Sequence, residues 1–223
     1  MNEQQPRFAF FDVDDTLIAI KSMFDFFPFW CARTGQSGEM KRFEEAFSKA
    51  RAAGASREKL NHLYYRFFQG ADLVQLETVA TEWFSDRFEA NPAPFFKRVT
   101  DRLEAHRVGG VHPVFISGSM LPLLAPIASE LQVAHILCTK LIIDDLGRLT
   151  GEIGAPQTIG DGKAVAIRQF LANHHAAPAE CFAYGDDISD IAMLEAVGNS
   201  VAVGSHPELL RISRQRGWAQ LAV

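Results

Sequence analysis

Positive charge is scarce in this sequence. Its 22 lysines and arginines are outnumbered by 27 aspartates and glutamates, which gives a formal net charge of −5. A protein that holds a nucleic-acid backbone needs a basic surface to replace the counterions of the phosphates. We therefore expect no nucleic-acid partner, and an anionic small molecule would have to be held by a few local groups.

Cysteine and long apolar runs are scarce as well. Cys31, Cys138 and Cys181 are far apart and form no Cys-x-x-Cys pair, a pattern that favours free thiols in a reducing compartment. The first residues are polar, and Asp12 interrupts the apolar run that follows, so neither a signal peptide nor a membrane span is indicated. We expect a soluble cytoplasmic protein with no membrane partner.

Short apolar runs alternate with helical patterns along much of the chain. Such runs are typical of strands that are buried on both faces, and strands that alternate with helices indicate a parallel sheet between two helical layers. The sequence therefore predicts an α/β protein with a Rossmann-like three-layer core. The expected strands are residues 8–11, 111–116, 181–184 and 201–203, and the expected helices are residues 120–131, 163–173 and 190–197.

One later segment has a different pattern. In residues 136–153, two β-rich runs flank the turn-forming sequence Asp144-Asp145-Leu146-Gly147. Two short runs around such a turn are typical of antiparallel pairing. The sequence predicts a small β-hairpin here.

The connection between the first two strands is roughly a hundred residues long, far beyond an ordinary loop. It has helical periodicity throughout, punctuated by glycines. We predict an inserted all-helical subdomain at residues 19–99 and an α/β core made of residues 1–18 and 100–223. The expected helices are residues 24–33, 39–53, 56–68, 73–88 and 94–106, of which the last rejoins the core.

Aromatic residues are abundant in this insert, and many of the chain's 18 phenylalanines lie there. A small helical subdomain that packs its own core with aromatics explains them. A second interpretation is an apolar pocket or a subunit interface near residues 23–30. Membrane association through this stretch is a weaker interpretation, because it lacks a basic polar face. A monomer and a homodimer both remain open.

Polar residues follow the apolar runs of three expected strands. Asp12-Val-Asp-Asp-Thr16, Ser117-Gly118-Ser119 and Gly185-Asp186-Asp187 each occupy such a place, and Lys163 stands at the expected start of a helix. Open parallel sheets bind ligands outside the carboxyl ends of their strands. We expect the acids, the lysine and the serine loop to converge on one crevice.

Phosphoryl transfer requires such a set of groups. Clustered carboxylates repel one another and a phosphate, so a divalent cation must hold them together, and Mg²⁺ prefers oxygen ligands. The predicted ligands are the carboxylates of Asp12 and Asp186, with the backbone carbonyl of Asp14. Lys163, Ser117 and the Gly118 amide would bind phosphoryl oxygens.

Asp12 is the candidate nucleophile toward phosphorus, and Asp14 is the candidate acid and base. Lying two residues after Asp12, Asp14 can reach the leaving-group side, protonate the departing alkoxide and later activate water. Asp190, one helical turn after Asp186, could orient Lys163 or a metal-bound water. Asp187 and Thr16 are further supporting positions, and Asp187 reads more readily as a helix cap than as a ligand.

The sequences DVDDT, SGS, a downstream Lys163 and GDDISD, in this order, resemble the four motifs of the haloacid dehalogenase superfamily. The helical insert after the first motif resembles the phosphoserine-phosphatase-like subclass IB with a helical C1 cap. The resemblance implies a magnesium-dependent phosphatase of a small phosphorylated metabolite. Asp12 would be the nucleophile, Asp14 the acid and base, Ser117 and Lys163 phosphate binders, and Asp186 a metal ligand. In this family an aspartate two residues after the nucleophile, as at Asp14, is typical of phosphatases and phosphotransferases and not of dehalogenases.

Two positions depart from that pattern. Phosphoserine phosphatases carry a glutamate about where Lys21 stands, and a cation there would favour a substrate with an extra anionic group over an amine. Asp187 stands where relatives often have a small residue. Arg57 and Arg66 add cations to the insert, either as substrate contacts or as a solvated face.

Two other functions fit the same motifs. A phosphotransferase would use the same aspartyl intermediate and pass the phosphoryl group to another hydroxyl. A non-catalytic protein that binds a phosphorylated ligand could also be built on this fold.

Overall fold

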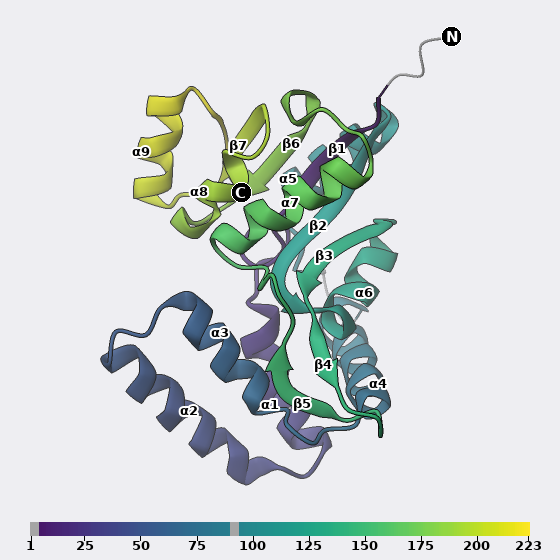
Figure 1. The fold of residues 1–223 in the computed structure, drawn as a ribbon, viewed down its shortest axis with the longest axis vertical. Coiled ribbons are helices and arrows are strands. Elements are labelled where there is room, and N and C mark those ends of the chain that lie inside the picture. Colours follow the sequence, from purple (N-terminus) through teal and green to yellow (C-terminus); the bar gives the residue numbers. More distant parts are fainter. Residues whose placement is uncertain (1–4, 90–93) are drawn as a thin grey trace.

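The computed structural model describes residues 5–89 and 94–223, and its centre is a six-stranded sheet (Figure 1). The strand order is β3-β2-β1-β6-β7-β8, and every neighbouring pair is parallel. The four predicted strands are confirmed as β1, β2, β6 and β7. The strands are β1 (Arg7–Phe11), β2 (Val111–Met120), β3 (His135–Thr139), β6 (Phe182–Gly185), β7 (Asn199–Val203) and β8 (Ala219–Leu221).

β1 shows how the sheet is buried on both faces. Successive side chains of a strand point to opposite faces, so Phe8 and Phe10 enter one hydrophobic cluster while Ala9 and Phe11 enter the other. Helices α5 and α6 cover the Ala9 face, and α7, α8 and α9 cover the opposite one. The predicted three layers are confirmed. These helices are α5 (Lys97–Val108), α6 (Leu121–Glu130), α7 (Asp161–Asn173), α8 (Ile191–Leu194) and α9 (Pro207–Arg216).

Between β1 and α5 the chain forms the predicted series of helices. Aromatic rings fill the space between them, as where Phe27 stacks on Phe43 with ring centroids 4.2 Å apart. This cluster continues into side chains of α5 and α6, so the aromatics pack a core that the insert shares with one face of the sheet. No helix in the described residues is both long and apolar enough to cross a membrane. The elements are α1 (Ser22–Arg33), α2 (Ser37–Ala52), α3 (Arg57–Arg66), α4 (Leu73–Phe84) and a π-helical turn η1 (Ser85–Glu89).

The predicted hairpin is present but shorter than expected. Its first run is strand β3, which joins the main sheet beside β2. The hairpin itself pairs β4 (Leu141–Ile143) with β5 (Leu149–Ile153) in antiparallel fashion. Asp144 Oδ1 closes the turn by accepting from the backbone N–H groups of Leu146 and Arg148, both at 2.9 Å. Residues 136–139 were misassigned because a short apolar run looks the same in either sheet.

Candidate active site

The carboxyl ends of β2, β1 and β6 lie side by side in the middle of the sheet. Asp12 follows β1 directly, Asp186 follows β6, and Ser117 lies near the end of β2. The backbone N–H of Asp12 also donates to Tyr184 O at 2.9 Å, which fixes the exit of β1 against β6. The parallel register therefore brings Asp12 close to groups that are more than a hundred residues away in the sequence.

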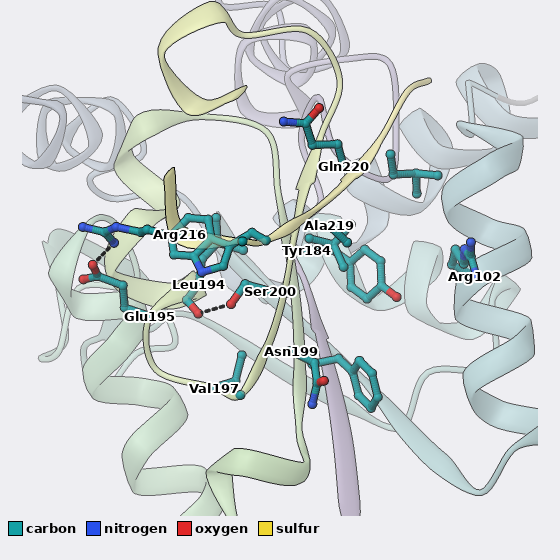
Figure 2. A pocket seen from close by; sticks show the side chains of 16 residues that line it. Arg102, Tyr184, Leu194, Glu195, Val197, Asn199, Ser200, Arg216, Ala219 and Gln220 are labelled. Atoms are coloured by element: carbon teal, nitrogen blue, oxygen red, sulfur yellow. Dashed lines mark hydrogen bonds and ion pairs between the residues drawn. The ribbon is translucent and has the colours of Figure 1, made fainter. Parts of the chain in front are cut away.

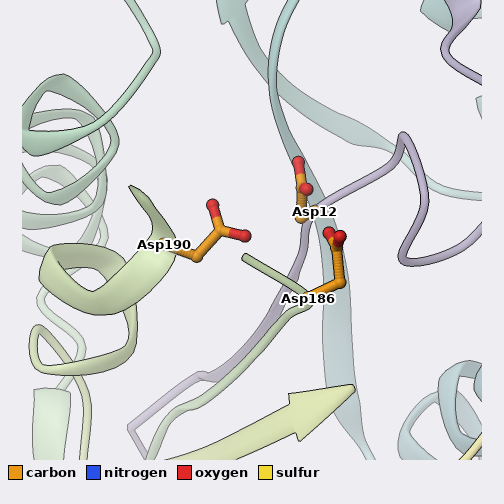
Figure 3. A group of neighbouring side chains, drawn as sticks. All are labelled: Asp12, Asp186 and Asp190. Atoms are coloured by element: carbon orange, nitrogen blue, oxygen red, sulfur yellow. The ribbon is translucent and has the colours of Figure 1, made fainter. Parts of the chain in front are cut away.

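Three carboxylates gather at this edge. Asp12, Asp186 and Asp190 each offer an oxygen within 4.8 Å of the others, and Figure 3 shows Asp190 pointing toward the neighbouring side chains of Asp12 and Asp186. Gly185 permits the approach, because a Cβ at this position would lie 2.7 Å from Asp190 Cβ. Oxygen donors this close together are suited to a hard divalent cation such as Mg²⁺.

Lys163 lies between two of these acids, in the first turn of α7. Its Nζ donates to Asp12 Oδ1 and to Asp190 Oδ1, both at 2.7 Å. Burial lowers the pKa of Lys163, but the carboxylates of Asp12 and Asp190 outweigh it and raise the pKa overall, so the amine stays charged. One ammonium does not balance three carboxylates. The remaining negative charge is a second reason why the cluster fits a bound cation.

Burial is the main reason why the pKa values of two of these acids lie above their usual range, and the neighbouring carboxylates add to it. Burial raises the pKa of Asp12, with Asp190 and Asp186 adding to the rise and Lys163 opposing it. Burial also raises the pKa of Asp186, against the hydrogen bond that Thr16 Oγ1 donates to its Oδ1 at 2.7 Å. Thr16 thus orients Asp186 through this hydrogen bond. Thr16 itself does not border the cavity that is described below.

Asp14 has a different hydrogen-bond partner from these three acids. Its Oδ2 accepts a hydrogen bond from Ser22 Oγ at 3.1 Å, whereas its buried Oδ1 has no hydrogen-bond partner among the described residues. Burial raises the pKa of Asp14 to about 6, although hydrogen bonds from Ser22 oppose the rise. A carboxyl group with that pKa can give up or take up a proton near neutral pH.

Ser117–Ser119, predicted as a loop, lie in the irregular last part of β2, and an internal hydrogen bond and helix α3 hold them in place. Ser117 Oγ accepts from the backbone N–H of Ser119 at 3.0 Å. Gly118 O accepts from two side chains of α3, Asn61 Nδ2 at 3.0 Å and Tyr65 Oη at 2.7 Å. These α3 contacts escape sequence analysis, because no motif marks Asn61 or Tyr65 and their position depends on how the insert packs.

Most of these groups border one cavity of about 340 Å³. It is lined by every predicted site residue except Thr16 and Arg66. Arg66 is exposed at the end of α3, and its backbone lies next to Gly151 of the hairpin. The sequence did not single out Arg51, which also borders the cavity and whose guanidinium carbon lies 5.8 Å from the Phe24 ring centroid.

Two cations from the insert side stand at the mouth of this cavity. Lys21 Nζ lies 3.1 Å from Asp15 Oδ2, and Arg57 donates to Asp187 Oδ2 at 2.8 Å and to Ser189 Oγ at 3.0 Å. Asp187 also caps the short helix that follows it, accepting from the Ser189 N–H at 2.8 Å. Burial raises the pKa of Asp187, but Ser189 and Arg57 outweigh it and hold the pKa below its usual value.

A larger cavity of about 750 Å³ lies elsewhere, between α5 and the C-terminal strands (Figure 2). Arg102, Tyr184 and Trp218 are among its lining residues, and Arg216 there pairs with Glu195. Its lining has one acid, whereas the smaller cavity has six: Asp12, Asp14, Asp15, Asp186, Asp187 and Asp190. The chemistry therefore favours the smaller cavity as the active site.

Comparison with known proteins also supports a hydrolase active site in this chain. The family model for haloacid dehalogenase-like hydrolases matches residues 9–195. A Mycobacterium tuberculosis H37Rv protein named "Probable phosphatase" is 31% identical over 218 residues, covering 96% of this chain and 74% of that protein. Phosphoserine phosphatase SerB1 of that strain is 28% identical over 222 residues, covering 94% and 68%. A structure of a protein of unknown function from Bordetella pertussis Tohama I has a TM-score of 0.84 at 26% identity, covering 98% and 99%.

Proposed function

Because this chain belongs to the haloacid dehalogenase-like hydrolase family, we propose that it is a magnesium-dependent phosphatase of small phosphomonoesters. Its catalysis would proceed through an aspartyl-phosphate on Asp12. One observation carries the proposal: Asp12, Asp186 and Lys163 meet within hydrogen-bonding and metal-binding distance beside Asp14, in a cavity that could admit a phosphoryl group. The phosphatase names of the relatives support the same reaction class.

The carboxylates of Asp12 and Asp186, with the backbone carbonyl of Asp14, would hold the magnesium ion. The donor set fits, since it is made of oxygens and carries more negative charge than Lys163 balances. A bound magnesium ion would neutralise this charge and polarise the phosphoryl oxygens. Asp190 pairs with Lys163 and would keep the ammonium in place.

In the first half of the reaction, a carboxylate oxygen of Asp12 attacks phosphorus and the bond from phosphorus to the leaving oxygen breaks. Asp14 gives its proton to that leaving oxygen, and the alcohol departs. In the second half, a water oxygen attacks the phosphorus of the aspartyl-phosphate while Asp14 takes one of the water's protons. The bond between Asp12 and phosphorus then breaks and releases inorganic phosphate.

Lys163 and residues 117–119, here called the phosphate loop, would bind the phosphoryl oxygens that carry charge in the transition state. Lys163 supplies a buried ammonium, and Ser117 and Gly118 supply a hydroxyl and a backbone N–H at the carboxyl end of β2. Preorganised donors in a buried site act more strongly than they would in water.

We assign residues 19–99 to a cap and residues 1–18 and 100–223 to the catalytic core. The assignment is supported by Asn61 and Tyr65 of α3, which hydrogen-bond the phosphate loop from the insert. Lys21 and Arg57 at the mouth of the cavity would then act on the leaving group, whose identity the cap selects.

The test uses the purified chain, a panel of phosphorylated metabolites and 4-nitrophenyl phosphate, with magnesium or with a chelator. We expect phosphate release only with magnesium, and a loss of about 1,000-fold or more in Asp12→Asn, because the nucleophile is removed. Asp145→Asn, an exposed turn position in the hairpin, is the matched control and should keep full activity. Unchanged turnover in Asp12→Asn would refute the mechanism, and ligand binding without phosphate release would favour a non-catalytic protein.

A further inference from the structure

Ser22 is the first residue of α1, and it contacts the group to which we assign proton transfer. Its side chain is fully buried at 0% exposure. Its Oγ lies 3.1 Å from Asp14 Oδ2 and 3.1 Å from Ser119 Oγ. Ser22 therefore joins the first helix of the insert both to the turn after β1 and to the phosphate loop in β2.

The direction of these hydrogen bonds follows from the number of protons. A serine hydroxyl has a single proton to donate. A carboxylate oxygen can only accept, so Ser22 donates to Asp14 and accepts from the Ser119 hydroxyl. The backbone N–H of Ser119 donates in turn to Ser117 Oγ at 3.0 Å. The chain of contacts thus runs from the phosphate-binding serine to the acid.

This arrangement distinguishes the two oxygens of Asp14. Oδ2 is occupied by Ser22, whereas Oδ1 is buried and has no hydrogen-bond partner among residues 5–89 and 94–223. A buried polar atom without a partner is costly, and in native proteins it often marks a catalytic group or a bound water or ion. Asp14 borders the cavity, and Oδ1 is the carboxyl oxygen that the hydrogen bond to Ser22 does not occupy.

We propose that Ser22 is a positioning residue that holds Asp14 by Oδ2 and so leaves Oδ1 to carry the proton that passes to the leaving-group oxygen. The inference rests on the proposed function and deepens it, since it gives the cap helix α1 a part in proton transfer as well as in substrate choice. The proton on Oδ1 passes to the leaving oxygen as its bond to phosphorus breaks, and a proton from the attacking water returns to Oδ1. Oδ2 keeps its hydrogen bond throughout.

The experiment compares leaving groups in Ser22→Ala. Nitrophenolate departs without protonation, whereas an alkoxide needs the acid, so 4-nitrophenyl phosphate and n-butyl phosphate separate the two cases. We expect the first-turnover release of butanol to fall about 10-fold or more and that of nitrophenolate about 3-fold or less, as acid catalysis is worth about 100-fold to 10,000-fold when complete. The KM for both substrates should change little.

Three further variants serve as controls for this comparison. Ser22→Thr keeps a hydroxyl and should restore most of the butanol release. Ser213→Ala is the matched control: Ser213 is also 0% exposed, but its hydroxyl donates to Leu210 O at 2.9 Å within α9, away from the cavity. It should leave both rates unchanged. If Ser22→Ala does not fold, Ser22→Cys, whose thiol is a weak donor, carries the same comparison.

Equal loss for the two leaving groups, no loss for either, or no rescue by Ser22→Thr would overturn the inference. Asp12→Asn and Asp14→Asn in the same assay separate it from the proposed function. Product formation by Asp12→Asn would refute the proposed function itself. A different result would contradict only the role of Ser22. In that result Asp12→Asn is inactive and Asp14→Asn shows the leaving-group effect, but Ser22→Ala does not.

Discussion

The two walls of the active-site cavity are built differently. The core wall, made of Asp12, Lys163, Asp186 and Asp190, comes from the sheet edge, and its charges are buried except that of Asp186, which is half-buried. The Lys163 side chain is 6% exposed and contacts two acids at 2.7 Å. The cap wall, made of Lys21, Phe24, Arg51 and Arg57, comes from the insert. Its cations are open to solvent, with Lys21 62% and Arg57 52% exposed.

This difference separates two tasks. Buried charges interact strongly and are fixed by the sheet, so the core wall is suited to a chemical step that is the same for every phosphate ester. Exposed cations on long side chains are screened by water and salt and can adopt several positions. The cap wall is therefore suited to discriminating among leaving groups without altering the chemistry. Substitutions on the two walls should therefore have effects on activity that differ in size and in kind.

The largest effect is expected on the core wall from Lys163→Met. Turnover should fall about 100-fold to 1,000-fold, because the substrate loses its buried cation. The fold should also lose about 3 kcal/mol, since two buried carboxylates are left without their partner. Turnover of 4-nitrophenyl phosphate and urea unfolding in the presence of a chelator measure the two effects separately.

Lys97→Met is the control for that variant. Lys97 makes an exposed ion pair with Asp101 at 2.7 Å on α5, so its loss should cost about 0.5 kcal/mol or less and leave turnover unchanged. Wild-type turnover in Lys163→Met would mean that the core wall does not carry the chemistry.

Much of the core wall could be predicted from sequence. Asp12 and Asp186 follow buried strands of one parallel sheet, and this topology forces their positions together whatever the rest of the chain does. Asp190 follows Asp186 by four residues, and Lys163 begins a helix, so short-range rules place both near the edge. The hydrogen bonds that link Lys163 to the acids could not be predicted, because they depend on side-chain packing.

The cap wall could be predicted only as a set of helices. Asn61, Tyr65 and Ser22 touch the core because α1 and α3 pack at one particular angle over the sheet edge, and no local pattern encodes that angle. Arg57 and Arg66 lie on the same helix, yet only Arg57 borders the cavity. The C-terminal elements α9 and β8 were also missed, since both are short and rich in polar residues.

An intermediate effect is expected where the two walls touch. Tyr65→Phe removes the hydroxyl that donates to Gly118 O at 2.7 Å. We expect kcat/KM to fall between about 3-fold and 10-fold, because the phosphate loop shifts slightly but keeps its donors. Stability should fall by about 1 kcal/mol. Tyr184→Phe loses a hydroxyl that pairs with His106 at 2.8 Å and does not border the active-site cavity, so it should cost similar stability and leave kcat/KM unchanged.

The smallest and most selective effect is expected from Lys21→Glu on the cap wall. Lys21 is exposed and already faces Asp15 at 3.1 Å, so the reversed charge should leave kcat for 4-nitrophenyl phosphate unchanged. It should raise KM about threefold for phosphate esters with a second anionic group and lower it for aminated ones, both effects fading in high salt. Lys41→Glu makes the same charge change on the exposed face of α2 and separates a local contact from the overall field. An identical substrate profile in Lys21→Glu and the wild type would remove Lys21 from the cap wall, and a shift shared by both variants would assign selectivity to net charge.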